Sequence, residues 1–331
     1  MFLTVTLLII GTILLIKGAD LFVSGSSRLA KAMKIPPLVI GLTLVSMGTS
    51  APEASVSINS AIAGMTDMSI GNVVGSNIFN TLFIIGLSAV ITPLAFGRDV
   101  IKYDLPVMTA LYGVLFVFAY AVTPMTLGVI EGALLLVLFA AYTAFILIRA
   151  KRTRPLPISG AALSAPPQAE QKEHKNSKPK RNIPLWLSIV LAIIGLAGVI
   201  FGGDLVVDSA AEIAVALGMS EALVGLTIVA VGTSLPELVT SVVAAAKKEN
   251  DIALGNVIGS NIFNVIFILG LTSVIHPSAL DYDTLADLFV MLCSGIVLMP
   301  LALQKGKVGR VSGAMLMISY AAYLTFIIVR S

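Results

Sequence analysis

Two nearly identical hexapeptides, GTSAPE at residues 48–53 and GTSLPE at residues 232–237, lie far apart in one chain. Each lies inside a strongly apolar segment, and each ends in a glutamate that directly follows a proline. A carboxylate is unfavourable at the centre of a bilayer, and proline interrupts a helix. A chain that places both features in apolar segments twice is expected to need them there for its function.

Apolar side chains dominate the whole chain: 57% of its 331 residues are hydrophobic and 12% are charged, with a mean hydropathy of +0.99. A soluble protein carries roughly twice that share of charge. Apolar runs of roughly 20 residues, long enough to cross a bilayer as helices, recur throughout. We therefore predict an all-α membrane protein with ten transmembrane helices, near residues 2–23, 38–63, 69–92, 104–122, 126–148, 184–204, 222–246, 252–275, 284–303 and 311–329.

A segment rich in Pro, Ser, Ala, Lys and Arg, residues 150–183, separates the fifth predicted helix from the sixth. It acts as a linker between two five-helix halves, residues 1–149 and 184–331. Lys and Arg occur in this linker and in alternate loops, whereas the intervening loops contain neither. Because Lys and Arg favour the cytoplasmic side, we predict a multi-pass protein of the cell membrane (inner or plasma) with a cytoplasmic linker and both termini outside.

The two hexapeptides belong to a longer internal repeat. Residues 41–93 align without a gap on residues 225–277, and about half of the aligned positions are identical. Since each half contains five helices, an odd number, the second copy enters the membrane in the opposite direction. Inverted halves of this kind are a transporter architecture, in which broken helices from both halves meet at a midplane substrate site. Helices 2, 3, 7 and 8 are expected to form that core.

The repeated segments supply oxygen atoms. Proline frees backbone carbonyls about a turn earlier, and these must be bonded or bind something in a membrane. The side-chain oxygens are carboxylates, hydroxyls and amides, on Glu53, Glu237, Thr49, Ser50, Thr233, Ser234, Ser76, Asn80, Ser260 and Asn264. Hard cations such as Ca²⁺ and Na⁺ prefer oxygen ligands, whereas zinc or copper would use His or Cys. Cys293 is the only cysteine.

The two glutamates are predicted to face each other across the centre. Facing carboxylates repel unless a cation lies between them or a proton neutralises one. One Ca²⁺ balances both charges, several Na⁺ can do so less strongly, and protons compete with either. The alternative, in which Glu53 and Glu237 pair with buried Lys or Arg, is disfavoured because no Lys or Arg lies within the membrane parts of the predicted helices 2, 3, 7 or 8.

The paired GTS-x-PE and GN-V-x-GSN-I-F-N segments resemble the two α-repeats of the cation/calcium antiporter superfamily, particularly the prokaryotic sodium/calcium exchangers. The resemblance implies that calcium is surrounded by Thr49, Glu53, Thr233 and Glu237. It also implies sodium sites formed by both glutamates, by Ser50, Ser76, Ser234, Ser260, Asn80 and Asn264, and by backbone carbonyls near Ser46 and Ala230. Asn264 departs from the family pattern, because many prokaryotic relatives carry aspartate at that position.

The leading hypothesis is a secondary antiporter that exchanges Na⁺ for Ca²⁺ by alternating access. The alternatives are a proton- or potassium-coupled Ca²⁺ antiporter and, less favoured, a cation channel that uses the two glutamates as a filter. An enzyme is not expected, because no nucleophile–base pair or His/Asp metal cluster is apparent. The expected partners are the transported Ca²⁺ and Na⁺ and the lipid bilayer. We expect no cofactor, no nucleic acid and a functional monomer.

Overall fold

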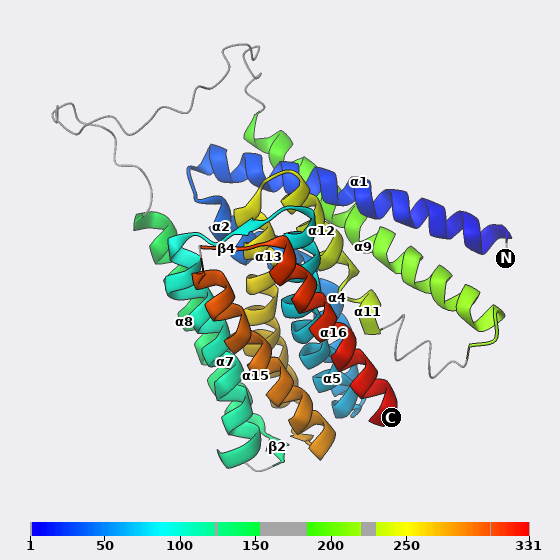
Figure 1. The fold of residues 1–331 in the computed structure, drawn as a ribbon, viewed down its shortest axis with the longest axis vertical. Coiled ribbons are helices and arrows are strands. Elements are labelled where there is room, and N and C mark those ends of the chain that lie inside the picture. Colours follow the sequence, from blue (N-terminus) through cyan, green and yellow to red (C-terminus); the bar gives the residue numbers. More distant parts are fainter. Residues whose placement is uncertain (1, 123–124, 153–183, 220–229, 305, 331) are drawn as a thin grey trace.

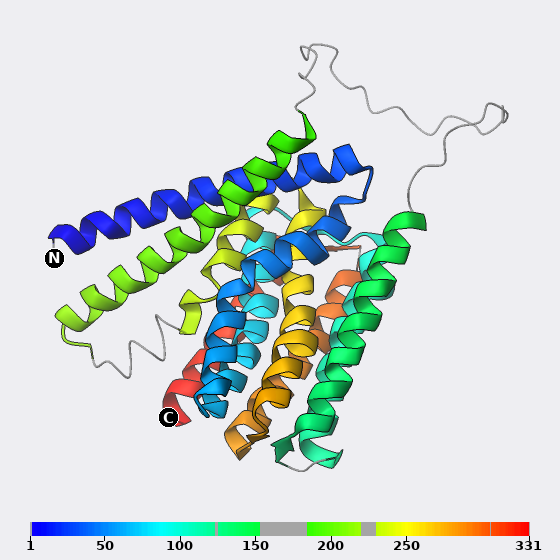
Figure 2. The same ribbon diagram turned by 180° about the vertical axis from the view of Figure 1, so that it is seen from behind.

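The computed structural model describes residues 2–122, 125–152, 184–219, 230–304 and 306–330, and it is almost entirely helical (Figures 1 and 2). The helices of the first half are α1 (Phe2–Met33), α2 (Pro37–Ile40), η1 (Gly41–Val45), α3 (Ser46–Thr49), α4 (Ala51–Ile62), α5 (Thr66–Ile78), η2 (Phe79–Ile84), α6 (Ile85–Ile91), η3 (Val100–Asp104), α7 (Leu105–Val117), η4 (Phe118–Val122) and α8 (Val129–Arg152). Those of the second half are α9 (Leu185–Ala216), α11 (Ala230–Gly232), α12 (Leu235–Ala246), α13 (Asn250–Phe263), η6 (Asn264–Leu269), α14 (Gly270–Ile275), α15 (Tyr282–Leu303) and α16 (Arg310–Arg330). The η segments are π-helical turns.

The predicted helical membrane fold is confirmed, but the helices are less regular than expected. Within the described residues, eight helical spans are long and apolar enough to cross a bilayer. The predicted helix at 38–63 is broken at Ser50, between α3 and α4. Its counterpart at 222–246 is broken between α11 and α12, and its first eight residues lie outside the described ranges. The predicted linker also lies outside them, apart from residues 150–152.

Four two-residue strands, which the all-α prediction did not include, pair segments from the two halves. β1 (Leu94–Ala95) runs antiparallel to β4 (Lys307–Val308), and β2 (Thr126–Leu127) runs antiparallel to β3 (Ser278–Ala279). Each pair satisfies loop backbone groups that the adjoining helices leave free. The two ladders lie at opposite ends of the helices (Figure 1). We name these ends the linker face, where α8 ends and α9 begins, and the far face, where α16 ends.

The long helices α1 and α9 lie side by side across the rest of the bundle (Figures 1 and 2). Glycines bring their backbones together: a Cβ built on Gly195 would lie 2.3 Å from the Phe22 backbone nitrogen, and one on Gly18 would lie 2.6 Å from that of Val199. Small residues allow such close approach of helices in membranes, where burial of apolar surface provides no driving force between them. The pair therefore packs by direct backbone contact.

The centre of the bundle is formed by the helices that carry the repeat. Every residue of α13 from Ile252 to Phe263 is buried, and most of α5, η2 and α6 is buried as well. By contrast, α1, α8, α9 and α16 expose most of their apolar side chains, as expected of helices that face lipid. The sequence segments with the most polar motifs are thus the most deeply enclosed.

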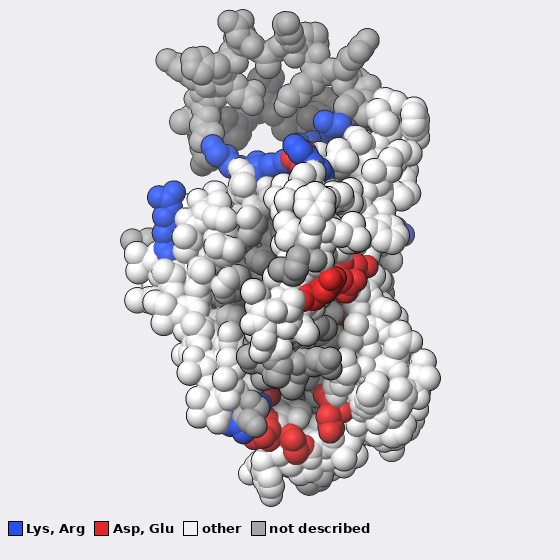
Figure 3. All heavy atoms as spheres, turned by 90° about the vertical axis from the view of Figure 1, so that its right-hand side faces the viewer, with Lys and Arg blue, Asp and Glu red and all other residues white. Residues whose placement is uncertain are grey.

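Charged side chains are distributed unevenly over the surface. On the face drawn in Figure 3, most Lys and Arg side chains gather toward the linker face, whereas Asp and Glu lie midway and toward the far face. The described basic residues of the linker face include Lys31, Lys247 and Lys307, and the acidic residues of the far face include Asp281 and Asp283. This is the asymmetry that the positive-inside rule associates with a cytoplasmic and an external side.

Candidate cation site

The two GTSxPE hexapeptides form the breaks in the helices at the centre of the molecule. Ser50 and Ser234 have nearly the same non-helical backbone, with φ/ψ of −79°/8° and −90°/5°. Each is followed by a helix with proline in its first turn, where the missing N–H costs no hydrogen bond. The glutamate comes next in the same turn, close to the positive end of the helix dipole, which favours an anionic side chain.

The serine of each break contacts the glutamate of the other half. Ser50 Oγ donates to Glu237 Oε1 at 2.8 Å, and Ser234 Oγ donates to Glu53 Oε1 at 2.9 Å. All four side chains are buried, with at most 1% exposed. These crossed hydrogen bonds bring the two hexapeptides together, although 184 residues separate them along the chain.

The serines of the second motif complete this cluster. Ser234 Oγ lies 3.0 Å from Ser76 Oγ, and Ser260 Oγ lies 3.4 Å from both Glu237 Oε1 and the carbonyl oxygen of Ser46. That carbonyl also accepts a bond from the Ser50 N–H at 2.9 Å. Ala230 belongs to the short helix α11 before the second break.

Two asparagines that the sequence analysis did not assign hold the threonines of the hexapeptides. Thr49 Oγ1 donates to Asn256 Oδ1 at 2.9 Å, and Thr233 Oγ1 donates to Asn72 Oδ1 at 3.2 Å. The amide nitrogen of each asparagine donates to the backbone oxygen of the glutamate in its own half, at 3.3 Å in both halves. The sequence does mark these two asparagines, because the dipeptide GN occurs in both copies of the second motif.

A second layer of amides lies where the inner helices change to π-helical turns. Asn80 Nδ2 donates to Asn261 Oδ1, and Asn264 Nδ2 donates to Asn77 Oδ1, both at 3.1 Å. Asn80 lies inside η2 and Asn264 begins η6. Such π-turns are frequent at functional sites, because they redirect one or two side chains out of the regular helical array. Here they lie beside the glutamates in both halves.

Four oxygen atoms of this cluster are buried and have no hydrogen-bond partner among the described residues: Glu53 Oε2, Glu237 Oε2, Asn80 Oδ1 and Asn264 Oδ1. Leaving a buried polar atom unpaired costs about 1–3 kcal/mol, and more for a charged group. The four are related in pairs by the repeat, and all are acceptors that hard cations prefer. The predicted Thr, Ser, Glu and Asn side chains are thus brought together as an oxygen-rich cluster that fits Ca²⁺ or Na⁺.

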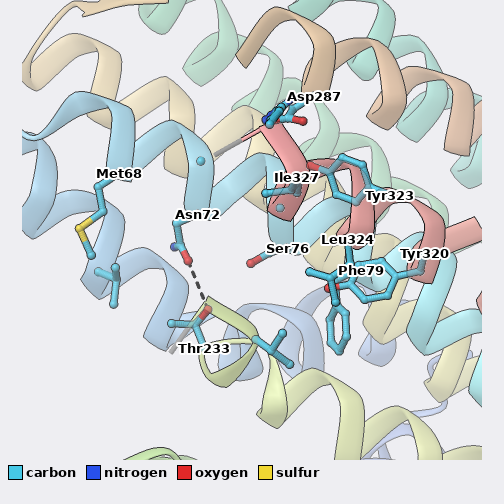
Figure 4. A pocket seen from close by; sticks show the side chains of 15 residues that line it. Met68, Asn72, Ser76, Phe79, Thr233, Asp287, Tyr320, Tyr323, Leu324 and Ile327 are labelled. Atoms are coloured by element: carbon cyan, nitrogen blue, oxygen red, sulfur yellow. Dashed lines mark hydrogen bonds and ion pairs between the residues drawn. The ribbon is translucent and has the colours of Figure 1, made fainter. Parts of the chain in front are cut away.

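Two cavities flank the cluster at positions related by the repeat, and they differ greatly in size. The larger one, about 420 Å³, is lined by Asn72, Gly75, Ser76, Phe79 and Thr233, among others (Figure 4). The smaller one, about 30 Å³, is lined by the counterparts Gly259 and Phe263 and by residues of α8. In Figure 4, Thr233 and Asn72 meet across the floor of the larger cavity, next to Ser76.

The linker side of the cluster is closed by direct packing. Cβ atoms built on Gly41 and Gly255 would lie within 3 Å of the facing glycine. Charged contacts add to the closure: Lys247 Nζ lies 2.6 Å from Asp20 Oδ1, and Ser27 Oγ donates to Glu249 at 2.8 Å. The lining of the larger cavity extends from Ser76 and Thr233 to Asp287 and Arg330, toward the far face.

The eight long apolar helical spans among the described residues define a polytopic helical membrane protein. Residues 3–148 and 187–329 match the profile of the family described as sodium/calcium exchanger protein. The chain belongs to this family.

Relatives and a solved structure agree with this assignment. The inner membrane protein YrbG of Escherichia coli K12 is 36% identical over 99% of this chain and 97% of its own. The sodium/calcium exchanger MaX1 of Methanosarcina acetivorans is 33% identical over 96% of each chain. The structure of the sodium/calcium exchanger from Methanococcus jannaschii superimposes with a TM-score of 0.80 at 31% identity, covering 98% of each chain. The predicted family is therefore confirmed.

Proposed function

We propose that this protein is a secondary antiporter that exchanges Na⁺ for Ca²⁺ at one central site. The observation that supports it most directly is the crossed pair of bonds from Ser50 to Glu237 and from Ser234 to Glu53. Each half of the chain holds the carboxylate of the other, so that two negative charges share one buried volume. A divalent cation balances both charges, and the unpaired oxygens of the cluster supply neutral ligands beside them.

Within this proposal, Thr49, Glu53, Thr233 and Glu237 surround Ca²⁺. The sodium ligands are the serines and asparagines of the cluster (Ser50, Ser76, Ser234, Ser260, Asn80 and Asn264), the backbone oxygens near Ser46 and Ala230, and both glutamates. Na⁺ and Ca²⁺ then compete for the same carboxylates, because the repulsion between these charges is relieved by either ion. Competition for shared ligands is what couples the movement of one ion to that of the other.

Alternating access is supported by the difference between the two cavities. Two copies of one repeat, inserted in opposite directions, can exchange conformations, so that the large and the small cavity exchange places. The larger cavity reaches Ser76 and Thr233 from the far face, whereas Thr49 and Ser260 on the other side are completely buried. The arrangement corresponds to a state open to the far face. The basic residues of the linker face support a cytoplasmic linker, which makes the far face external.

The direct test is ⁴⁵Ca²⁺ uptake into proteoliposomes that contain the purified protein. Vesicles loaded with Na⁺ and diluted into Na⁺-free medium are expected to accumulate Ca²⁺. Vesicles loaded with choline are not expected to do so. Uptake driven only by a proton gradient would instead support the proton-coupled alternative, and uptake without any counter-ion gradient would support a channel.

Potassium is not expected to be required for this exchange. Asn80 and Asn264 are fully buried and neutral, so the cluster carries only the charges of Glu53 and Glu237. These two charges balance one Ca²⁺ and leave none for a second, larger cation. Na⁺-driven Ca²⁺ uptake should therefore be the same when K⁺ is replaced by choline, with valinomycin controlling the membrane potential where K⁺ is present.

Loss of uptake without K⁺ at constant potential would contradict this prediction. Asn264→Asp is the companion variant, since it adds a third carboxylate to the two of Glu53 and Glu237. If charge is what excludes K⁺, this variant should acquire a dependence on K⁺ or on pH that the parent protein lacks.

A further inference from the structure

An aspartate–arginine pair stands at the outer part of the larger cavity, away from the oxygen cluster. Asp287, on α15, and Arg330, at the end of α16, both line this cavity, together with Asn72, Ser76 and Thr233. Arg330 Nη2 lies 2.5 Å from Asp287 Oδ2, and both side chains are less than one-fifth exposed. Figure 4 shows Asp287 beside Tyr323 on the opposite side of the cavity from Thr233.

Asp287 keeps one carboxylate oxygen, Oδ1, that is buried and makes no hydrogen bond of ordinary geometry with a described residue. The Tyr323 hydroxyl lies close enough to interact with this carboxylate. Arg330 is held from a second direction as well, because its Nη1 donates to the backbone oxygen of Asp283 at 3.3 Å and its guanidinium lies 5.0 Å from the centre of the Phe326 ring. The guanidinium is thus fixed in place, with a charged group of each sign in the wall of a largely apolar cavity.

The first half of the chain contains a matching pair. The segments GALLLVLFAAYTAFILIR (132–149) and GAMLMISYAAYLTFIIVR (313–330) align without a gap, and Arg149 falls on Arg330. Arg149 Nη1 lies 2.8 Å from Asp104 Oδ1, and Asp104 Oδ2 again has no hydrogen-bond partner among the described residues. Here Asp104 is completely buried, and Arg149 also pairs with Asp99, with Nη2 3.1 Å from Oδ2. Neither Asp104 nor Arg149 is among the residues that line the smaller cavity.

We propose that Asp287 and Arg330 set the electrostatic potential of the route by which cations reach the site from the far face. The proposal rests on the proposed cation exchange and adds a pair of residues to it. Arg330 offsets the charge of Asp287, so that the pair itself is neutral, while the nearby carboxylates of Asp281 and Asp283 also interact with Arg330. A charge in a weakly polar wall acts on passing cations more strongly than the same charge in water.

The sign of each effect follows from the charge. Arg330→Gln leaves Asp287 uncompensated and should lower the Ca²⁺ concentration that gives half-maximal uptake from the far face. Asp287→Asn leaves Arg330 uncompensated and should raise it. The double variant restores neutrality and should return to the parent value. The electrostatic energy of a divalent ion in a given potential is twice that of a monovalent ion. The factor by which the half-saturating Ca²⁺ concentration changes should therefore be the square of the factor for Na⁺: about four-fold for Ca²⁺ and about two-fold for Na⁺ at low ionic strength.

The experiment measures the Ca²⁺ and Na⁺ concentrations that give half-maximal transport. It uses right-side-out and everted membrane vesicles, which expose opposite faces of the protein to the medium. Arg330→Gln should change the values only at the far face. Arg149→Gln, which removes the matching arginine outside the larger cavity, should leave the far-face values unchanged. Lys307→Gln is the matched control, since it removes the same charge from an exposed strand at the linker face, outside the residues that line the cavity. Raising the ionic strength should reduce the effect of Arg330→Gln.

Any of three results for Arg330→Gln would overturn the proposal: unchanged half-saturating concentrations, equal factors of change for Ca²⁺ and Na⁺, or the same change at both faces of the protein. If Arg330→Gln does not fold, Asp287→Asn tests the same charge with the opposite sign, and Arg330→Lys should retain the parent values. Failure of the proposed function is distinguishable, because the parent protein would then show no Na⁺-driven Ca²⁺ uptake at all.

Discussion

Replacing either central glutamate with glutamine is expected to abolish Ca²⁺ transport while the protein still folds. Glu53 and Glu237 are both completely buried, and each accepts a serine hydroxyl from the other half. Glutamine has nearly the same shape and keeps an oxygen acceptor for that hydroxyl, so the helix breaks should remain intact. The variant removes one of two charges that balance a divalent ion. Loss of one partner of a buried charge pair costs about 3 kcal/mol or more, which corresponds to roughly 100-fold weaker binding.

The measurement is Na⁺-driven ⁴⁵Ca²⁺ uptake by Glu53→Gln and Glu237→Gln, with folding checked by monodispersity in detergent. Glu131→Gln is a suitable control, because Glu131 is also buried, at 5% exposed, and its carboxylate accepts a bond from the Gly128 N–H that glutamine can also accept. The control should transport normally. Calcium uptake near the parent rate in either glutamine variant of the central pair would refute a site built on two carboxylates.

Adding a single methyl group at Gly195 is expected to cause the largest loss of stability. A Cβ at this position would lie 2.3 Å from the Phe22 nitrogen, 2.7 Å from the Phe22 Cα and 2.8 Å from the Gly18 oxygen, and all three are backbone atoms that cannot rotate away. Gly195→Ala therefore has to push α1 and α9 apart. Overpacking of this kind costs typically 1–3 kcal/mol, and here it also opens the close contact between the two longest helices. We expect the melting temperature in detergent to fall by about 5 °C or more.

Gly113→Ala provides the comparison, because Gly113 also lies inside a helix, α7, but the nearest atom to its added Cβ is Leu292 Cδ1 at 3.8 Å. Alanine favours a helix over glycine by about 1 kcal/mol, so this variant should melt at the same temperature or higher. Equal melting temperatures for the two variants would show that the contact between α1 and α9 yields more easily than its backbone distances indicate.

Much of the candidate site could be predicted from the residues alone, because the same chemistry appears twice. A glutamate beside a proline costs free energy in an apolar membrane segment, so its presence there indicates a function. Two copies in the same register indicate that both contribute to one site. The oxygen-only donor set indicated a hard cation. The sequence did not reveal that the asparagines of the two GN motifs accept hydrogen bonds from the threonines of the hexapeptides. These bonds join opposite halves of the chain, so no regular spacing along the sequence indicates them.

The membrane class, the positions of the helix breaks and the residues that gather at the centre could all be predicted from the amino-acid sequence. These properties are local or periodic: hydropathy, proline and the repeat can be read position by position. The tertiary structure decided which serine contacts which glutamate, because that pairing depends on how the two halves cross. It also decided that the two related cavities differ, at about 420 and about 30 Å³. Nearly identical segments cannot specify such a difference, because the volume of each cavity depends on how the surrounding helices pack against it.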